Sequence, residues 1–116
     1  MMSLYDTAHA LAGMIRESEA VQECARLKQI AEEDQTNRTL IAEYKRLQIS
    51  LQMRALSAPE TAGDDAQRFS KIASLLYMNS DTAAYLMAEM RVSQMLADLV
   101  KILTEATGLN MELPGM

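Results

Sequence analysis

The sequence predicts an all-α protein, and three observations support this fold class. The chain is rich in helix-favouring residues such as Ala, Leu, Met, Glu and Gln, whereas four Gly, two Pro, one Phe and no Trp among 116 residues leave little material for a sheet. Apolar side chains recur at intervals of three and four residues, which is the period of an amphipathic helix. Residues able to cap a helix precede four of these periodic stretches. We therefore expect one elongated helical domain.

The periodic stretches predict five helices within this single domain, residues 1–116. They cover residues 3–17, 19–33, 35–57, 65–78 and 80–107. The side chains expected to cap the last four are those of Ser18, Asp34, Asp64 and Asn79. Residues 58–64 contain Pro59 and Gly63 and predict the main loop, and residues 109–116 after Gly108 predict a frayed tail.

The stretch from about Asp81 to Thr107 predicts a helix that its own chain cannot fully cover. Its strongly polar side chains fall on one narrow stripe, formed by Arg91, Gln94, Asp98, Lys101 and Glu105. Its broad apolar face consists of Tyr85, Ala88, Val92, Met95, Leu96, Leu99, Ile102, Leu103 and Ala106, and an apolar shoulder consists of Leu86, Met90, Ala97 and Val100. Because one neighbouring helix would cover only part of this surface, we expect a second copy of the chain to shield the rest.

The helix expected at 35–57 carries apolar side chains on two opposite sides. One side follows the rhythm of a coiled-coil seam and consists of Leu40, Tyr44, Leu47, Leu51 and Arg54. The other side consists of Ala42, Ile49, Met53 and Leu56. A surface helix needs only one apolar face, so the second side predicts a subunit interface. The interface residues we expect are Ile49, Met53, Leu56, Leu86, Met90 and Val100.

The charge is unevenly distributed along the chain, whose net charge is −5. Residues 1–34 carry seven acids and three bases, and residues 58–116 carry a net charge of −4. The segment between them has a net charge of +3, from Arg38, Lys45, Arg46 and Arg54 against Glu43. The acidic balance argues against a dedicated nucleic-acid surface. The basic segment nevertheless leaves two alternatives: pairing with acidic helices of this chain or a neighbour, or direct binding to an RNA backbone.

The single cysteine indicates the redox state of the compartment, and the absence of long apolar runs bears on export and membrane insertion. Cys24 alone excludes an intramolecular disulfide, which fits a reducing compartment. The N-terminus lacks a basic region followed by an apolar one, and no run of about 18 apolar residues occurs. We therefore expect a cytoplasmic protein without membrane segments.

Few residues offer candidate chemistry. Asp6 and His9 could form half of a metal site or an acid–base pair, but no second His accompanies them, so a structural or exposed His is the alternative. Cys24 lies on an apolar stripe and is either a buried side chain or a reactive thiol. Glu89 lies at the margin of the apolar face of its helix, so it needs an ion-pair partner, such as Arg54, Lys71 or another subunit, or else contacts an outside ligand. We expect no enzyme, metal or cofactor, and Glu89 is a candidate for fixing helix register.

Several short segments resemble those of one bacterial family. The first are Tyr5-Asp6, Leu11-Ala12 and the run from Ile15 to Glu19. Further along the chain come Leu47-Gln48, Leu51-Gln52, Asn79, Tyr85-Leu86, Ala88-Glu89 and Arg91. In this order, and across about residues 4–108, they resemble the YlbF/YmcA family, which includes the YheA-like proteins.

The resemblance implies a fold and a role. The implied fold is an antiparallel coiled-coil helical hairpin with short accessory helices, completed as an elongated bundle by oligomerisation. The implied role is that of a non-catalytic adaptor or regulatory protein that recruits protein partners and influences ribonuclease-dependent mRNA maturation and development in bacteria. The chain departs from the family where Asp34-Gln35 and Asn79-Ser80 stand in place of Asp-Pro or Asn-Pro. It also lacks the extra cysteines that could hold a metal cluster in some relatives. The alternative function is that of an RNA-binding accessory protein.

Overall fold

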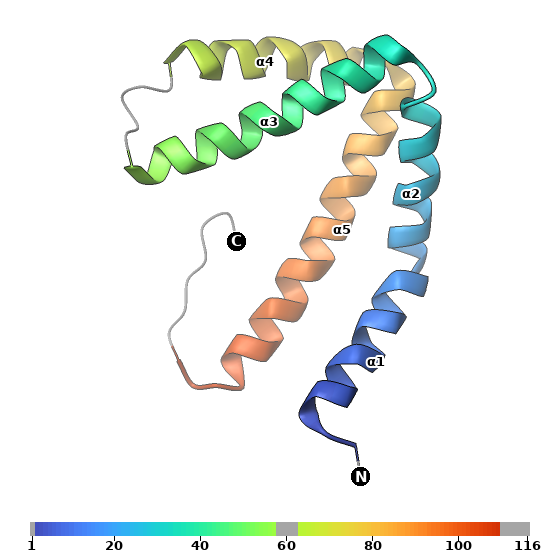
Figure 1. Cartoon of the computed structure of the whole chain (residues 1–116), viewed down its shortest axis with the longest axis vertical. Coiled ribbons are helices and arrows are strands. Elements are labelled where there is room, and N and C mark those ends of the chain that lie inside the picture. Colours follow the sequence, from blue (N-terminus) through green and yellow to red (C-terminus); the bar gives the residue numbers. More distant parts are fainter. Residues whose placement is uncertain (1, 58–62, 110–116) are drawn as a thin grey trace. The chain divides into compact units, whose positions relative to one another are not determined.

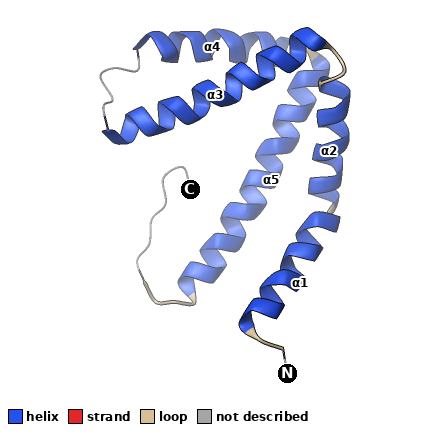
Figure 2. Cartoon of the chain, viewed as in Figure 1, coloured by secondary structure: helices blue, strands red, loops and turns tan. Residues whose placement is uncertain are grey.

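The computed structural model describes residues 2–57 and 63–109, and these form two compact units. Unit 1 comprises Met1–Ala25 and Met87–Met116, and unit 2 comprises Arg26–Leu86. Throughout the described ranges the regular structure is entirely α-helical, without a strand (Figure 2). This confirms the predicted all-α class, whereas the single domain, the coiled-coil packing and the completion by oligomerisation stay predictions.

Within residues 2–57 and 63–109, five helices follow one another in sequence order, and Figure 1 labels each of them. They are α1 (Leu4–Glu17), α2 (Glu19–Ala31), α3 (Gln35–Ser57), α4 (Gly63–Met78) and α5 (Ser80–Glu105). In unit 2, α3 and α4 lie side by side and run in opposite directions. No helix in the described part of the chain is both long and apolar enough to cross a bilayer.

Side-chain caps set the starts of several helices. Ser18 accepts a hydrogen bond from the amide of Val21 at 3.3 Å, and Asp34 accepts one from the amide of Asn37 at 2.9 Å. Asn79 accepts the amides of two residues of α5, Asp81 at 3.0 Å and Thr82 at 3.2 Å. These bonds satisfy amides that have no partner within the helix, and they confirm three of the predicted caps.

The start of α4 differs from the prediction. The helix begins at Gly63, so Asp64 and Asp65 lie in its first turn, and Asp64 is not the residue before the helix. Carboxylates in a first turn are favourable because they face the positive end of the helix dipole. Of the loop predicted at 58–64, residues 63 and 64 therefore belong to α4, and residues 58–62 lie outside the described residues.

Two helix ends are also earlier than predicted. Helix α2 ends at Ala31 instead of residue 33, because the backbone turns there toward Asp34, which caps the next helix. In this turn the amide of Glu33 donates to the carbonyl of Ile30 at 3.3 Å. Helix α5 ends at Glu105 instead of residue 107. Gly108, which follows, has a φ of 70°, a conformation that glycine adopts without steric cost. Of the predicted tail, residues 110–116 lie outside the described residues.

The buried core belongs almost entirely to unit 2. Its buried apolar side chains are Ala31, Ile41, Leu47, Ile72, Leu76, Tyr85 and Leu86, and the hydroxyl-bearing Thr82 is buried among them. In unit 1 the only buried residue among those described is Ala88, and α1 buries none. The two units therefore differ sharply in how much apolar surface the chain itself removes from water.

Candidate functional site

The predicted seam of α3 is covered by the chain itself. Leu47 is fully buried, and the other seam residues are half-buried. The ring of Tyr44 stacks on that of Phe69 in α4, with centroids 4.8 Å apart and an interplanar angle of 19°. The periodicity thus identified the correct face of α3, and the helix that lies on it is α4.

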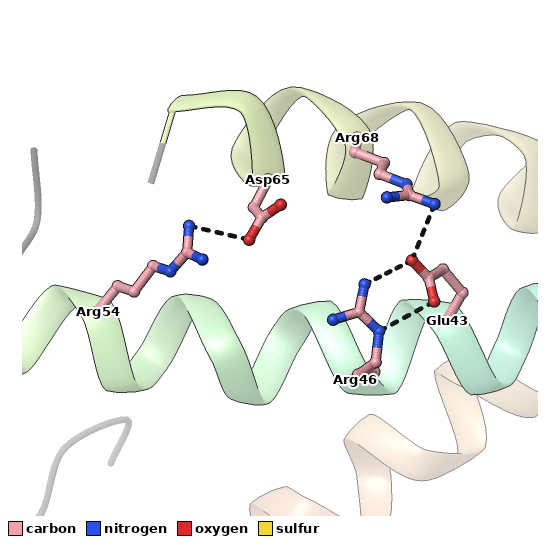
Figure 3. Close-up of polar contacts among 5 residues, drawn as sticks. All are labelled: Glu43, Arg46, Arg54, Asp65 and Arg68. Atoms are coloured by element: carbon pink, nitrogen blue, oxygen red, sulfur yellow. Dashed lines mark hydrogen bonds and ion pairs between the residues drawn. The ribbon is translucent and has the colours of Figure 1, made fainter. Parts of the chain in front are cut away.

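Charged side chains join α3 to α4 along one edge of this pair (Figure 3). Arg54 pairs with Asp65 at 2.9 Å. Glu43 accepts two hydrogen bonds from Arg46, at 2.7 and 3.0 Å, and also pairs with Arg68 of α4 at 3.3 Å. Glu43 therefore connects a base on its own helix with a base on the neighbouring helix.

This arrangement shifts two pKa values. The hydrogen bond from Arg46 is the main cause that holds the pKa of Glu43 below its ordinary value; partial desolvation opposes it, and the charges of Arg46 and Arg68 add to it. The pKa of Arg46 is raised, chiefly by the same hydrogen bond. Glu43 is thus a stable carboxylate at neutral pH, which is the behaviour of a structural ion pair and not of a proton-transfer group.

Each of the four bases proposed as an RNA surface has a partner within the chain. Arg38 donates to the backbone carbonyl of Glu32 at 3.0 and 3.1 Å. Lys45 donates to the hydroxyl of Tyr85 and lies 4.9 Å from the centroid of that ring. Arg46 and Arg54 form the ion pairs described above. The geometry therefore favours internal pairing, and Phe69 already occupies one face of the Tyr44 ring.

The second apolar side of α3 lies open to solvent. Its three large members, Ile49, Met53 and Leu56, are between 59% and 72% exposed, and we call them the α3 line. The α3 line lies on the face of the helix opposite the seam that α4 covers. Of the remaining predicted interface residues, Met90 is exposed and Val100 is half-buried.

Leu86 is the exception in the predicted interface. Its side chain is only 2% exposed, because it belongs to the core of unit 2 with Tyr85 and Leu76. This burial within one copy does not favour a contact with a second copy, and the placement of Leu86 at a subunit interface stays a prediction. Helical spacing shows which residues share a face, but it does not show which part of that face the chain covers itself.

The α5 segment in unit 1 presents two surfaces. The predicted polar stripe is solvent-exposed along its length, and within it Gln94 donates to Asp98 at 2.9 Å. On the apolar side, Val92, Met95 and Leu99 are half-buried, whereas Leu96, Ile102 and Leu103 are exposed. We call these last three the α5 face. Ile102 and Leu103 are more than half exposed, at 62% and 58%, and Leu96 is 43% exposed.

The remaining candidate residues take ordinary positions. His9 is exposed, and Asp6 completes a capping box with Ser3 at the start of α1, a structural use that the sequence reasoning missed. Cys24 is half-buried, and no group of three metal-binding side chains occurs among the residues described. Glu89 is half-buried. Arg54, which was expected as a partner of Glu89, forms an ion pair with Asp65. The register-fixing role of Glu89 stays a prediction.

Thr82 is the structural residue with the weakest signal in the sequence. Its side chain is fully buried, and its hydroxyl donates to the backbone carbonyl of Leu76 near the end of α4. The carbonyl of Asn79 lies 3.2 Å from the same hydroxyl. Since carbonyls in the last turn of a helix lack partners within it, Thr82 satisfies a group that burial would otherwise leave unpaired. Only its position three residues after a capping Asn could have indicated this role.

Comparison with known proteins places this fold among bacterial relatives. A family model described as "Control of competence regulator ComK, YlbF/YmcA" matches residues 4–107. A similar UPF0342 protein from Caldicellulosiruptor saccharolyticus is 28% identical, over 100% of this chain and 97% of its own length. Another from Desulfitobacterium hafniense is 31% identical, over 90% of this chain and 85% of its own.

One solved structure resembles the fold of this chain. It is described as "Protein of Unknown Function (DUF964) from Bacillus stearothermophilus", and it matches with a TM-score of 0.76 at 22% sequence identity. The match covers 90% of this chain and 92% of that one. At this level of identity the likeness concerns the fold alone.

Proposed function

The chain belongs to the YlbF/YmcA family, and from this premise we propose that it is a non-catalytic helical adaptor or regulatory protein that self-associates and recruits a protein partner. The family's description links it to control of the competence regulator ComK, which is a regulatory role. We extend this to the type of process that the sequence resemblance implied, ribonuclease-dependent mRNA maturation and developmental regulation in bacteria.

The observation that carries the proposal is the two-sided character of α3. Helix α4 covers one side, and the chain leaves the α3 line on the other side in solvent. Single exposed apolar residues are common, but three large ones in one row along a helix mark a surface that another protein covers. Self-association would bury this row against a second copy, just as an amphipathic helix buries its apolar stripe against the core of a protein.

The polar side chains around Glu43 fit a structural role within an adaptor. They satisfy one another through the hydrogen bonds from Arg46 and the ion pair with Arg68. A catalytic site needs convergent polar groups with a free position for a reacting atom. An adaptor needs only exposed apolar surface with a polar surround, as the α3 line provides.

The experiment that tests the proposal replaces two members of the α3 line with charged residues. Ile49→Asp with Met53→Asp puts two carboxylates into the proposed contact, so we expect the oligomer to dissociate in sedimentation velocity. Gln48→Asp with Gln52→Asp is the matched control, because it adds the same charge at exposed positions of the same helix outside the line. Equal sedimentation of the wild type and the Ile49/Met53 variant would contradict the proposed interface.

A further inference from the structure

Helix α4 carries a line of side chains that the described part of the chain leaves in solvent. Its members recur at intervals of four, three, four and three residues, so they lie along one face of the helix. They are Asp64, Arg68, Lys71, Leu75 and Met78, and we call them the α4 row. All five are exposed, and the row lies entirely within unit 2.

The C-terminal half of the α4 row is apolar surface that the packing of α3 on α4 does not use. Ile72 and Leu76 of α4 are buried, whereas Leu75 is 50% exposed and Met78 is 83% exposed. At 3.6 residues per turn, Leu75 and Met78 point about 100° and 160° away from Leu76 around the helix axis. Removing these two side chains from water therefore requires a further surface.

The N-terminal half of the α4 row is mainly cationic. Lys71 forms no ion pair with any described residue. Arg68 reaches Glu43 at 3.3 Å (Figure 3), but the two shorter bonds of that carboxylate, at 2.7 and 3.0 Å, come from Arg46. Asp64 is the one acid of the row, and in the first turn it faces the free amides of its own helix. The row thus offers positive charge to a partner, next to an apolar patch.

This pattern argues against two other occupants. In a two-fold contact between two α4 rows, parallel or antiparallel, the central Lys71 would face Lys71 of the second copy, so like charges would meet. A nucleic-acid backbone is bound by a continuous cationic surface, often with aromatic rings for the bases. The α4 row instead begins with an acid and ends with two apolar side chains.

We propose that the α4 row is the docking surface for an amphipathic helix of a partner protein, with carboxylates opposite Arg68 and Lys71 and apolar side chains opposite Leu75 and Met78. The spacing of the row is that of a seam between two helices, and its length of about 21 Å accommodates about two heptads of a partner helix. Such docking rests on the partner recruitment proposed above and gives it a surface, separate from the α3 line that is proposed for self-association.

Binding of a synthetic peptide tests the docking surface. The acidic probe is a helix-stabilised peptide of about three heptads, with two Leu and two Glu placed to face Met78, Leu75, Lys71 and Arg68 in an antiparallel pair. The basic probe has Lys in place of both Glu. Fluorescence anisotropy measures the binding of each labelled probe to the full chain at low salt. The wild type should bind the acidic probe at least tenfold more tightly than the basic probe.

Two substitutions locate this binding on the α4 row. Lys71→Glu should weaken binding of the acidic probe about fivefold and strengthen binding of the basic probe. Leu75→Gln should weaken binding of the acidic probe about fivefold through lost apolar contact. Lys28→Glu is the matched control, because it makes the same charge change at an exposed position of unit 2 outside the row, and it should bind both probes like the wild type. Far-UV circular dichroism checks that each variant is folded.

Other outcomes overturn the docking surface. They are a wild type that binds neither probe or binds both equally, and a Lys71→Glu variant that behaves like Lys28→Glu. If a homopolymeric RNA binds in place of the acidic probe and loses affinity in Lys71→Glu, the surface is for nucleic acid. If Leu75→Gln dissociates the oligomer in sedimentation velocity, a second copy occupies the row.

Sedimentation also separates this proposal from the proposed self-association. If the wild type forms an oligomer but does not bind the acidic probe, only the docking surface is wrong. If the wild type remains a monomer and binds the acidic probe with the expected sensitivity to Lys71→Glu, self-association is wrong and the docking surface stands.

Discussion

Thr82 allows the sharpest test of how unit 2 is held together. Its buried hydroxyl donates to the carbonyl of Leu76, so Thr82→Val replaces a donor with a methyl group of similar size and leaves that carbonyl without this partner. Losing the bond costs about 0.5–1.5 kcal/mol, and an unsatisfied buried group raises the cost to about 1–3 kcal/mol. We therefore expect the free energy of unfolding to fall by about 1–3 kcal/mol.

Thr82→Ser provides the matched control. Serine keeps the hydroxyl and removes one methyl group, which costs about 0.8 kcal/mol through lost apolar burial. Urea unfolding followed by circular dichroism at one fixed protein concentration measures both variants, because association would otherwise shift the apparent stability. If the Val variant proves as stable as the wild type, or more stable than the Ser variant, the hydrogen bond does not hold α5 to the end of α4.

Three further predictions concern the α3–α4 pair. Leu47→Ala should lower the free energy of unfolding by about 2–5 kcal/mol, because it opens a cavity under a fully buried side chain; urea unfolding measures this, and a loss comparable to that of an exposed Leu56→Ala variant would argue against the core. Because the pKa of Glu43 is lowered on folding, its stabilisation is present above about pH 4.5 and is lost as the pH falls through the folded value. Glu43→Gln should therefore be less stable than the wild type at pH 7, and urea midpoints at pH 7 and pH 3 should show the difference shrinking in acid; a constant difference would refute this. Filter binding should detect no RNA association at low salt, and an affinity that falls steeply with salt and depends on Arg38 would instead favour the RNA-binding alternative.

Much of the helical layout was predictable from local chemistry. Ser18, Asp34 and Asn79 cap helices because their side chains reach the free amides of the following turn, and this geometry depends only on neighbours in the chain. The start of α4 was mispredicted because Asp64 suits the first turn of a helix as well as the position before it. The ends of α2 and α5 were predicted two residues too long, since apolar spacing continues past the point where the backbone turns, whereas those of α1, α3 and α4 agree with the prediction.

The candidate surfaces were less predictable because they depend on which helix covers which face. The period of α3 identified both of its apolar sides, but not that α4 takes the seam and leaves the α3 line in solvent. Leu86 had the spacing of an interface residue and proved to be buried beside Tyr85. Similarly, the positive segment at 35–57 suggested a basic surface. The pairing of Arg46 with Glu43 is local to α3, but that of Arg54 with Asp65 depends on two helices that meet only in the folded chain.

The measurement that bears most directly on this account is the solution mass of the unmodified protein over a wide concentration range. Because the α3 line and the α5 face lie open in a single chain, we predict that analytical ultracentrifugation will find species larger than the 12.9 kDa monomer, with a population that rises with concentration. A uniform 12.9 kDa species at every concentration would contradict the account.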